Sequence, residues 1–123
     1  MQMASGARML ATGTIVPNED TISITINTGV TGWKNFLLVA DEMPVTDSDV
    51  IRYLGMRYVN IDGDYDIMAF GASTHNSDYP NNVVSHSLLS GYTTINGSNV
   101  SFNGIAATIG KMIAGYSYTW YVW

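Results

Sequence analysis

The chain contains no cysteine, so neither disulfide bridges nor thiol-ligated metals can stabilise it. Charge is scarce as well: charged residues make up 12% of the 123 positions, about half the share typical of globular domains. Stability must therefore come from packing or from oligomerisation. Much of the surface is left neutral and polar, which is common where neighbouring subunits of an assembly cover it.

Positive charge is too sparse to follow a phosphate backbone. The net charge is −5, and the five basic residues are scattered along the chain at Arg8, Lys34, Arg52, Arg57 and Lys111. No electropositive stripe results from this distribution. The sequence therefore predicts no nucleic-acid partner.

Long apolar runs are also missing. No stretch approaches the length of about 18 apolar residues that a membrane-spanning helix needs, and the opening MQMASGARMLATG lacks the apolar region of about 7 to 15 residues of a secretory signal. We therefore expect no membrane partner and no signal peptide, with synthesis in a cytoplasm. Residues 1–8 are predicted to form a flexible N-terminal arm, and residues 9–123 a single β-sandwich domain.

The most informative stretch is the last one, AGYSYTWYVW, from Ala114 to Trp123. Its alternation predicts a β-strand with Tyr116, Tyr118, Trp120 and Val122 on one face, and Ser117, Thr119, Tyr121 and Trp123 on the other. Both faces carry large aromatics. We therefore expect a central strand with one face in a core and the other against a second layer or a partner chain.

Further strands are predicted where apolar residues alternate or cluster between turn signals. The predicted strands are 9–16, 21–27 (TISITIN), 33–41, 50–60, 65–72, 83–89, 92–95 and 98–102, and loops are expected at 42–49 and 73–82. The continuous apolar run from Phe36 to Ala40 favours a strand covered on both faces over a short helix. Gly55 is predicted to mark a β-bulge.

Two short turn signals complete the fold prediction. Asn96-Gly97, flanked by alternating residues, predicts a hairpin turn, and Asp62-Gly63 predicts another turn. Eight to ten short strands with frequent turns indicate an all-β fold, an antiparallel β-sandwich with a jelly-roll-like arrangement as one possibility.

Metal binding is not supported by the one acidic cluster. Asp62, Asp64 and Asp66 match the first three ligand positions of a calcium loop, but Ile67 stands where that loop needs glycine and Ser73 where it needs glutamate. An acidic turn is the preferred interpretation. We predict no metal and no cofactor.

The residues for catalysis are equally incomplete. His75 lies in a predicted loop and His86 lies between serines, but no G-x-S-x-G elbow or H-E-x-x-H motif accompanies them. The paired carboxylates, Asp41 with Glu42 and Asp47 with Asp49, fall in or beside a solvated loop with no apolar pocket to raise a pKa. A hydrolase remains a weak alternative, and we predict that the protein is not an enzyme.

Aromatic residues offer a different kind of site. Trp33, Tyr53, Tyr58, Tyr65, Tyr79 and Tyr92 are candidates for a platform on which sugar rings stack. The competing interpretation places most of them in the core or an interface. Asn96-Gly97-Ser98 and Asn99-Val100-Ser101 match the glycosylation sequon, which we attribute to chance.

Three segments carry a family resemblance: ATGTIVPNEDTISITINTGV (11–30), KNFLLVAD (34–41) and YTWYVW (118–123). Together they resemble short β-sandwich domains of bacteriophage virion structural proteins. In that group a Gly-Thr strand leads to an alternating strand, a glycine turn, an apolar strand ending in Ala-Asp, and a final aromatic strand. Where members often carry a His-Gly-Leu-Gly turn, this chain has Asn27-Thr28-Gly29-Val30.

The resemblance implies a non-enzymatic virion component, as a capsid accessory (decoration or head-fibre) protein or a tail appendage. It implies contacts with other virion proteins and a homo-oligomer, with a trimer expected. The interface is predicted at Tyr116, Tyr118, Trp120, Tyr121 and Trp123. The alternative is an adhesin-like module that binds a host surface glycan.

Overall fold

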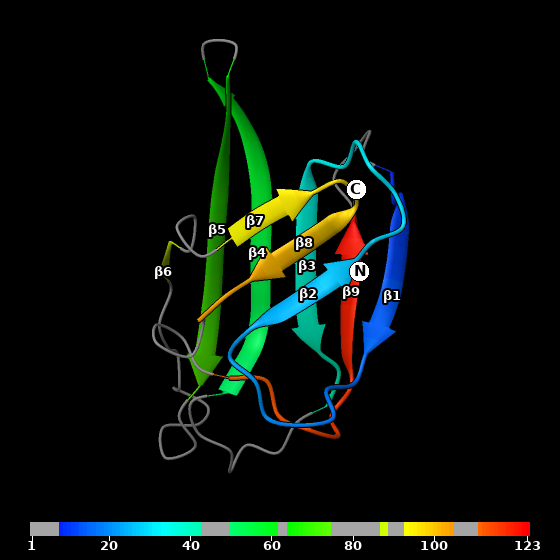
Figure 1. The fold of residues 1–123 in the computed structure, drawn as a ribbon, viewed down its shortest axis with the longest axis vertical. Coiled ribbons are helices and arrows are strands. Elements are labelled where there is room, and N and C mark those ends of the chain that lie inside the picture. Colours follow the sequence, from blue (N-terminus) through cyan, green and yellow to red (C-terminus); the bar gives the residue numbers. More distant parts are fainter. Residues whose placement is uncertain (1–7, 43–49, 62–63, 75–86, 89–92, 105–110) are drawn as a thin grey trace.

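The chain forms an all-β structure of two sheets packed face to face (Figure 1). The computed structural model describes residues 8–42, 50–61, 64–74, 87–88, 93–104 and 111–123, and for residues 58–61, 64–74 and 87–88 it describes the backbone alone. All pairings between strands in these ranges are antiparallel. The predicted antiparallel β-sandwich is confirmed, with nine strands in the described ranges.

The larger sheet has six strands in the order β1-β9-β3-β4-β5-β6. Their bounds are β1 Ala11–Ile15, β3 Asn35–Ala40, β4 Val50–Ile61, β5 Asp64–Thr74, β6 Ser87–Leu88 and β9 Tyr118–Val122. The first and last strands of the chain are neighbours in this sheet. The C-terminal strand lies between β1 and β3, as its two aromatic faces predicted.

The smaller sheet has three strands in the order β2-β8-β7, namely β2 Ile24–Asn27, β8 Asn99–Phe102 and β7 Thr93–Asn96. It crosses in front of β9, β3 and β4 in Figure 1. The predicted hairpin exists, but its turn lies one residue later than expected. Asn96 pairs with Asn99, so Gly97 and Ser98 form the two-residue loop, and Gly97 takes the positive φ of 64° that the first loop position requires.

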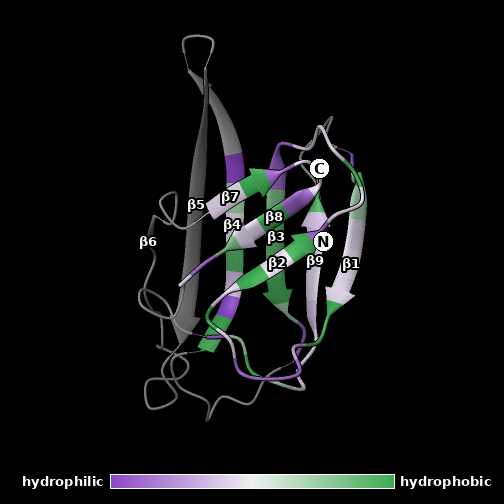
Figure 2. Cartoon of the chain, in the orientation of Figure 1, coloured by the Kyte–Doolittle hydropathy of each residue, from purple (hydrophilic) through white to green (hydrophobic). Residues whose placement is uncertain are grey.

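Inward-facing side chains of both sheets make one hydrophobic core. Leu38 on β3, Leu54 on β4 and Val100 on β8 are each 0% exposed. Phe36 packs at a tilt of 42° against Phe102 of the smaller sheet, with ring centroids 5.6 Å apart, a separation within the usual range for aromatic pairs. Figure 2 shows that β3 is apolar along most of its length, and burial alternates residue by residue along β8 and β9. This alternation is the reason the two sheets bury one face each.

The second predicted strand, 21–27, is only partly formed. Thr21 leaves the ladder to form backbone hydrogen bonds with Met112, at 3.0 and 2.8 Å, and its hydroxyl donates to the carbonyl of Ser23. This local side-chain bond competes with extended pairing. As a result Ile22 is 46% exposed, whereas the alternation predicted that it shares one face of the strand with Ile24 and Ile26, of which Ile26 is buried.

The strand β4 contains the predicted irregularity at a different position. The pairing register with β5 shifts between Ile51 and Tyr53, not at Gly55. One extra residue at Arg52 allows both Ile51 and Leu54 to face the core, each 0% exposed, which an uninterrupted two-residue period would not permit.

Two other predicted segments differ from the structure. In β3, Phe36 and Leu38 are buried while Leu37 and Val39 are only half-buried, so the described chain fully covers one face of this strand and not both. At the C-terminus, Ala114 and Gly115 form a turn, with Gly115 at a φ of 83°, and the strand begins at Tyr118 rather than Ala114.

Several predictions concern residues outside the described ranges. These are the arm up to residue 7, the Asp62-Gly63 turn, most of the loop at 42–49 and most of the strand at 83–89. Of the predicted loop at 73–82, the first two residues instead continue β5, where Ser73 pairs with Ile51 and Thr74 with Val50.

Candidate interaction surface

The strand β9 turns its two faces into different surroundings. Tyr118 and Val122 are 0% exposed and Trp120 is 7% exposed, whereas Thr119 and Tyr121 between them are half-buried. Tyr118 and Trp120 therefore belong to the core of this chain and are not available to a partner. Tyr121 and Trp123, on the other face, remain as the accessible part of the predicted interface.

Strand pairing continues this second face across four strands. Thr12, Tyr121, Leu37 and Gly55 form one row across β1, β9, β3 and β4, and Thr14, Thr119, Val39 and Tyr53 form the next. We call the surface made by Thr12, Thr14, Leu37, Val39, Tyr53, Thr119, Tyr121 and Trp123 the outer sheet face. It points away from the core because the residues that alternate with these face inward.

The composition of the outer sheet face resembles that of a docking surface. Leu37, Val39 and Tyr121 make a half-buried apolar centre, and Thr12 and Thr14 on β1 form an exposed hydroxyl-bearing margin. An apolar centre inside a polar rim is the usual anatomy of a protein–protein interface. In the described part of the chain both sheets use their other face for the core, so no described strand covers this one.

A small polar cluster fixes one end of the outer sheet face. The two carboxylate oxygens of Asp41 accept hydrogen bonds from Ser117 Oγ at 2.8 Å and from Thr119 Oγ1 at 2.7 Å. The backbone N–H of Asp41 also donates to the carbonyl of Ser117 at 2.9 Å. These bonds tie the end of β3 to the start of β9. Sequence reasoning assigned Asp41 only to a pair of carboxylates and missed this role.

The C-terminal residue is held in place by its backbone. The carbonyl oxygen of Trp123 accepts from the N–H groups of Lys34 and Asn35, each at 2.9 Å, and its own N–H donates to Asn35 at 3.1 Å. Three backbone bonds position the half-buried indole at the end of the outer sheet face. A backbone held this firmly loses little further freedom on binding a partner.

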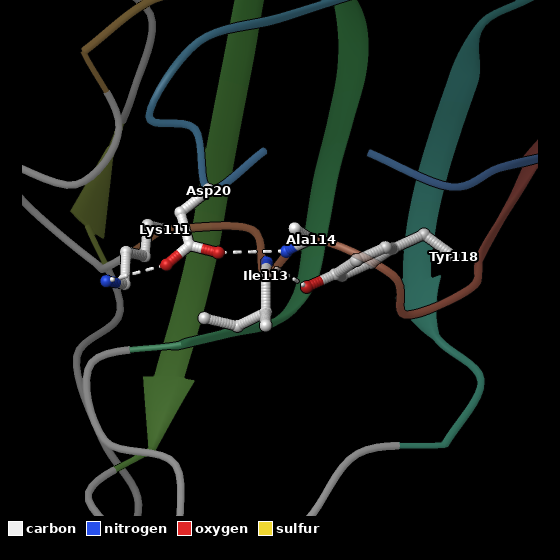
Figure 3. Close-up of polar contacts among 5 residues, drawn as sticks. All are labelled: Asp20, Lys111, Ile113, Ala114 and Tyr118. Carbon is white, nitrogen blue, oxygen red and sulfur yellow. Dashed lines mark hydrogen bonds and ion pairs between the residues drawn. The ribbon is translucent and has the colours of Figure 1, made fainter. Parts of the chain in front are cut away.

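Polar contacts also fix residues 111–114, which lead into β9 (Figure 3). Asp20 accepts from the backbone N–H of Ala114 at 2.9 Å and pairs with Lys111 Nζ at 3.1 Å. The Ala114 N–H, and next the Lys111 ammonium, hold the pKa of Asp20 below its usual value. Tyr118 Oη accepts from the N–H of Ile113 at 3.1 Å, and Tyr116 is half-buried against the core. Tyr116 and Tyr118 therefore support β9 and do not form an outer patch.

The two aromatic residues of the predicted sugar platform whose side chains are described, Trp33 and Tyr53, lie on opposite faces of the larger sheet. Trp33 is 3% exposed and stacks on Phe36 in the core, so it is not available to a ligand. Tyr53 lies on the outer sheet face, and the side chains of Tyr58, Tyr65, Tyr79 and Tyr92 lie outside the described set. An open pocket of about 300 Å³ lies between the end of β1 and the start of β2, lined by Ile15, Val16, Pro17, Asn18, Glu19, Thr21, Ser23, Ile24 and Thr25. It has no aromatic wall.

The remaining candidate sites fall mostly outside the described residues. His75 and His86 lie there, and so do Asp47, Asp49 and the side chains of the aspartate cluster. Among the described residues, no three His, Cys, Asp or Glu side chains are grouped as a metal site would require. A search of the same residues finds no helix with the length and apolarity to cross a membrane.

Comparison with known proteins adds no further constraint on the function. No protein-family model, no curated protein and no solved structure matches this chain.

Proposed function

We propose that this protein is a non-enzymatic structural component of a bacteriophage virion, a capsid accessory protein or a tail appendage, that acts through protein–protein contacts. The virion assignment rests on the resemblance of the segments 11–30, 34–41 and 118–123 to short virion β-sandwich domains. The observation that supports an assembly role is the outer sheet face, with its apolar centre and hydroxyl margin on the six-stranded sheet. A contiguous apolar surface of this kind is usually covered by another protein.

The docking partner in this proposal is a sister subunit or another virion protein. Tyr121 and Trp123 supply large, amphipathic side chains, and such aromatics are the typical anchors of protein interfaces. Leu37 and Val39 lie beside Tyr121 across the β3–β9 pairing and give it an apolar surround. The charges on this face lie at its margins, at Asp41 beside Thr119 and at the exposed Arg57, which pairs with Asn35.

Particle binding tests the proposal directly. Phage particles from cells that make this protein are sedimented and imaged after gold labelling of the protein. The same measurement is made with the labelled Tyr121→Ser variant. Thr94→Ser serves as a control, since Thr94 is exposed on β7 of the other sheet. We expect wild type and the control to decorate particles at a fixed position, with loss of labelling for Tyr121→Ser. Wild-type protein that never sediments with particles would overturn the virion assignment.

A glycan-binding module is the second candidate. Its supporting observation is that Tyr53 and Tyr121 lie on the same sheet face as the hydroxyls of Thr12, Thr14 and Thr119. Sugar recognition combines an aromatic surface with such hydrogen-bonding groups. Binding of purified protein to host surface polysaccharide, lost in Tyr121→Ser, would favour this function over the assembly role.

A further inference from the structure

Among the described strands, β1 is an edge of the larger sheet, and it pairs with β9 on one side only. Protein edges are normally protected by lysine, proline, a bulge or a charged side chain that points inward. The segment Leu10–Val16 (LATGTIV) has no charge and no proline. Its register with β9 is unbroken from Ala11 to Ile15, and irregular only at Leu10, whose N–H donates to the carbonyl of Val122, the partner of Ala11. Such an edge aggregates unless a specific strand pairs with it.

Exposed apolar side chains stand at both ends of this edge. Leu10 is 39% exposed and Val16 is 56% exposed. Thr12 and Thr14, which alternate between them, are exposed on the same side of the strand. Only one other large hydrophobic residue in the described chain, Ile22, is exposed to a comparable degree. Figure 2 shows the arrow of β1 in white to green, without strongly hydrophilic residues.

The residues of this edge are arranged symmetrically around Gly13. Thr12 and Thr14 flank it, then Ala11 and Ile15, then Leu10 and Val16. We propose that β1 pairs antiparallel with β1 of a second copy of this chain, about a two-fold axis at Gly13. Each Thr12 then lies opposite Thr14 of the other copy, and each exposed Leu10 opposite an exposed Val16. A two-fold interface must be complementary to itself, and this strand meets that requirement at every pair.

The charges at the two ends of the segment fit the same pairing. Arg8 precedes the strand and Glu19 follows it, and both are exposed. An antiparallel pairing brings Arg8, before the strand, to the end of the second copy's strand, where the chain bends at Asn18 and Glu19. The two-fold axis repeats this attraction at the other end. A parallel pairing would instead bring like charges together.

This pairing deepens the homo-oligomeric assembly proposed above and rests on that proposal. Because Thr12 is the neighbour of Tyr121 in the sheet, joining two β1 strands makes the two outer sheet faces continuous. The assembly offers its partner a doubled surface. A two-fold contact also predicts dimers or larger even-numbered assemblies, in place of the trimer that the resemblance implies.

Cysteine cross-linking tests the register, because the natural chain has no cysteine. The Cα atoms of directly opposed residues lie about 4.5 to 5.5 Å apart, a distance that a disulfide can span. Residues two positions off the direct pair lie about 7 to 8 Å apart, which is too far for a disulfide. Mixing Thr12→Cys protein with Thr14→Cys protein under mild oxidation should therefore give a covalent dimer. Either variant alone should give little. Equal cross-linking in all three samples, or none in the mixture, would refute the pairing.

A second measurement uses charge at the edge. Val16→Lys places a cation opposite Leu10 and close to Arg8 of the other copy, twice in each dimer. We expect the dimer dissociation constant, measured by sedimentation, to rise at least about tenfold. The matched control is Ile22→Lys, at a residue outside the edge that is 46% exposed against 56% for Val16, and this variant should leave the constant unchanged. Circular dichroism confirms that both variants fold.

The outcomes separate this inference from the proposed function. A wild-type protein that stays monomeric or forms only trimers in solution, yet decorates particles, would refute the β1 pairing and leave the virion role standing. A cross-linked dimer that never binds particles would support the pairing and refute the virion role.

Discussion

Replacing Gly13 with alanine should destabilise the fold through one identifiable contact. Gly13 is the direct partner of Trp120 in the β1–β9 pairing, and the indole of Trp120 lies over the glycine backbone. A Cβ atom added at Gly13 would lie 2.5 Å from Cζ2, 2.6 Å from Cε2 and 2.8 Å from Nε1 of that ring. Carbon atoms in favourable contact are about 3.5 to 4.0 Å apart, so the ring or the strand must move by roughly 1 Å.

The surroundings of Trp120 make that movement costly. The residue is 7% exposed and pairs with Leu38 of β3 on its other side, so the ring is confined by the core. Overpacking a core of this kind costs about 1 to 3 kcal/mol. Alanine also lowers the conformational entropy of the unfolded chain, which stabilises the folded state by about 0.4 to 1 kcal/mol. We therefore expect a net loss of about 1 to 2 kcal/mol, or a melting temperature lower by roughly 3 to 10 °C for a chain of this length.

Thermal unfolding followed by circular dichroism measures this loss, and a double-mutant cycle assigns its cause. Trp120→Phe removes the part of the ring that the new Cβ meets, so Gly13→Ala should cost less in the Trp120→Phe background than in the wild type. Thr14→Ala, an exposed change on the same strand, is the control for altered strand propensity. If Gly13→Ala melts at the wild-type temperature, or costs the same in both backgrounds, the steric argument is wrong.

Three further predictions concern the polar contacts, the C-terminus and metals. Because the pKa of Asp20 is lowered in the folded state, its contribution to stability is present above the unfolded pKa of about 3.9 and is lost as the pH falls through the folded pKa. Asp20→Asn should therefore be less stable than wild type at pH 7, and a difference in melting temperature that does not shrink in acid would contradict this. Trp123→Ala should lower both the melting temperature and the average mass measured by light scattering at micromolar concentration, and a variant that matches wild type in both would remove Trp123 from the interface. Adding a chelator should leave the melting temperature unchanged, since no complete metal site was predicted, and a drop of several degrees would restore the calcium interpretation.

The two-residue period of the sequence predicted most of the fold. It placed Tyr118, Trp120 and Val122 on one face of the C-terminal strand, and these three are the residues of β9 that enter the core. The same period gave the wrong direction for Ile22. Thr21 forms backbone hydrogen bonds with Met112, near the other end of the chain, and a local pattern contains no information about such a distant contact. It failed again at Arg52, where an extra residue shifts the register of β4. Local alternation predicts the direction of a side chain only while the ladder is unbroken.

The candidate surface was predictable only in part. Tyr121 and Trp123 were identified from the C-terminal strand alone. Their neighbours Thr12, Leu37 and Val39 were missed because they belong to strands whose lateral order no local pattern encodes. The alternation in ATGTI was a usable signal for β1, but only the structure shows that β1 is an edge. The symmetry around Gly13 has meaning only once that edge is known.

The position of β1 also couples assembly to folding. In the described ranges β1 pairs with β9 alone, and the bond from Thr12 Oγ1 to the carbonyl of Trp120, at 2.7 Å, joins residues 108 positions apart. The strand can therefore dock only when nearly the whole chain is in place, and it is held from one side. A strand of this kind opens more easily than a central one.

A second copy that pairs with the free edge binds only the docked form, so mass action stabilises the docked strand. The melting temperature of wild type should then rise across about a hundredfold increase in protein concentration. Val16→Lys should abolish this dependence, and a wild-type melting temperature that is independent of concentration would show that the edge of β1 stays unpaired.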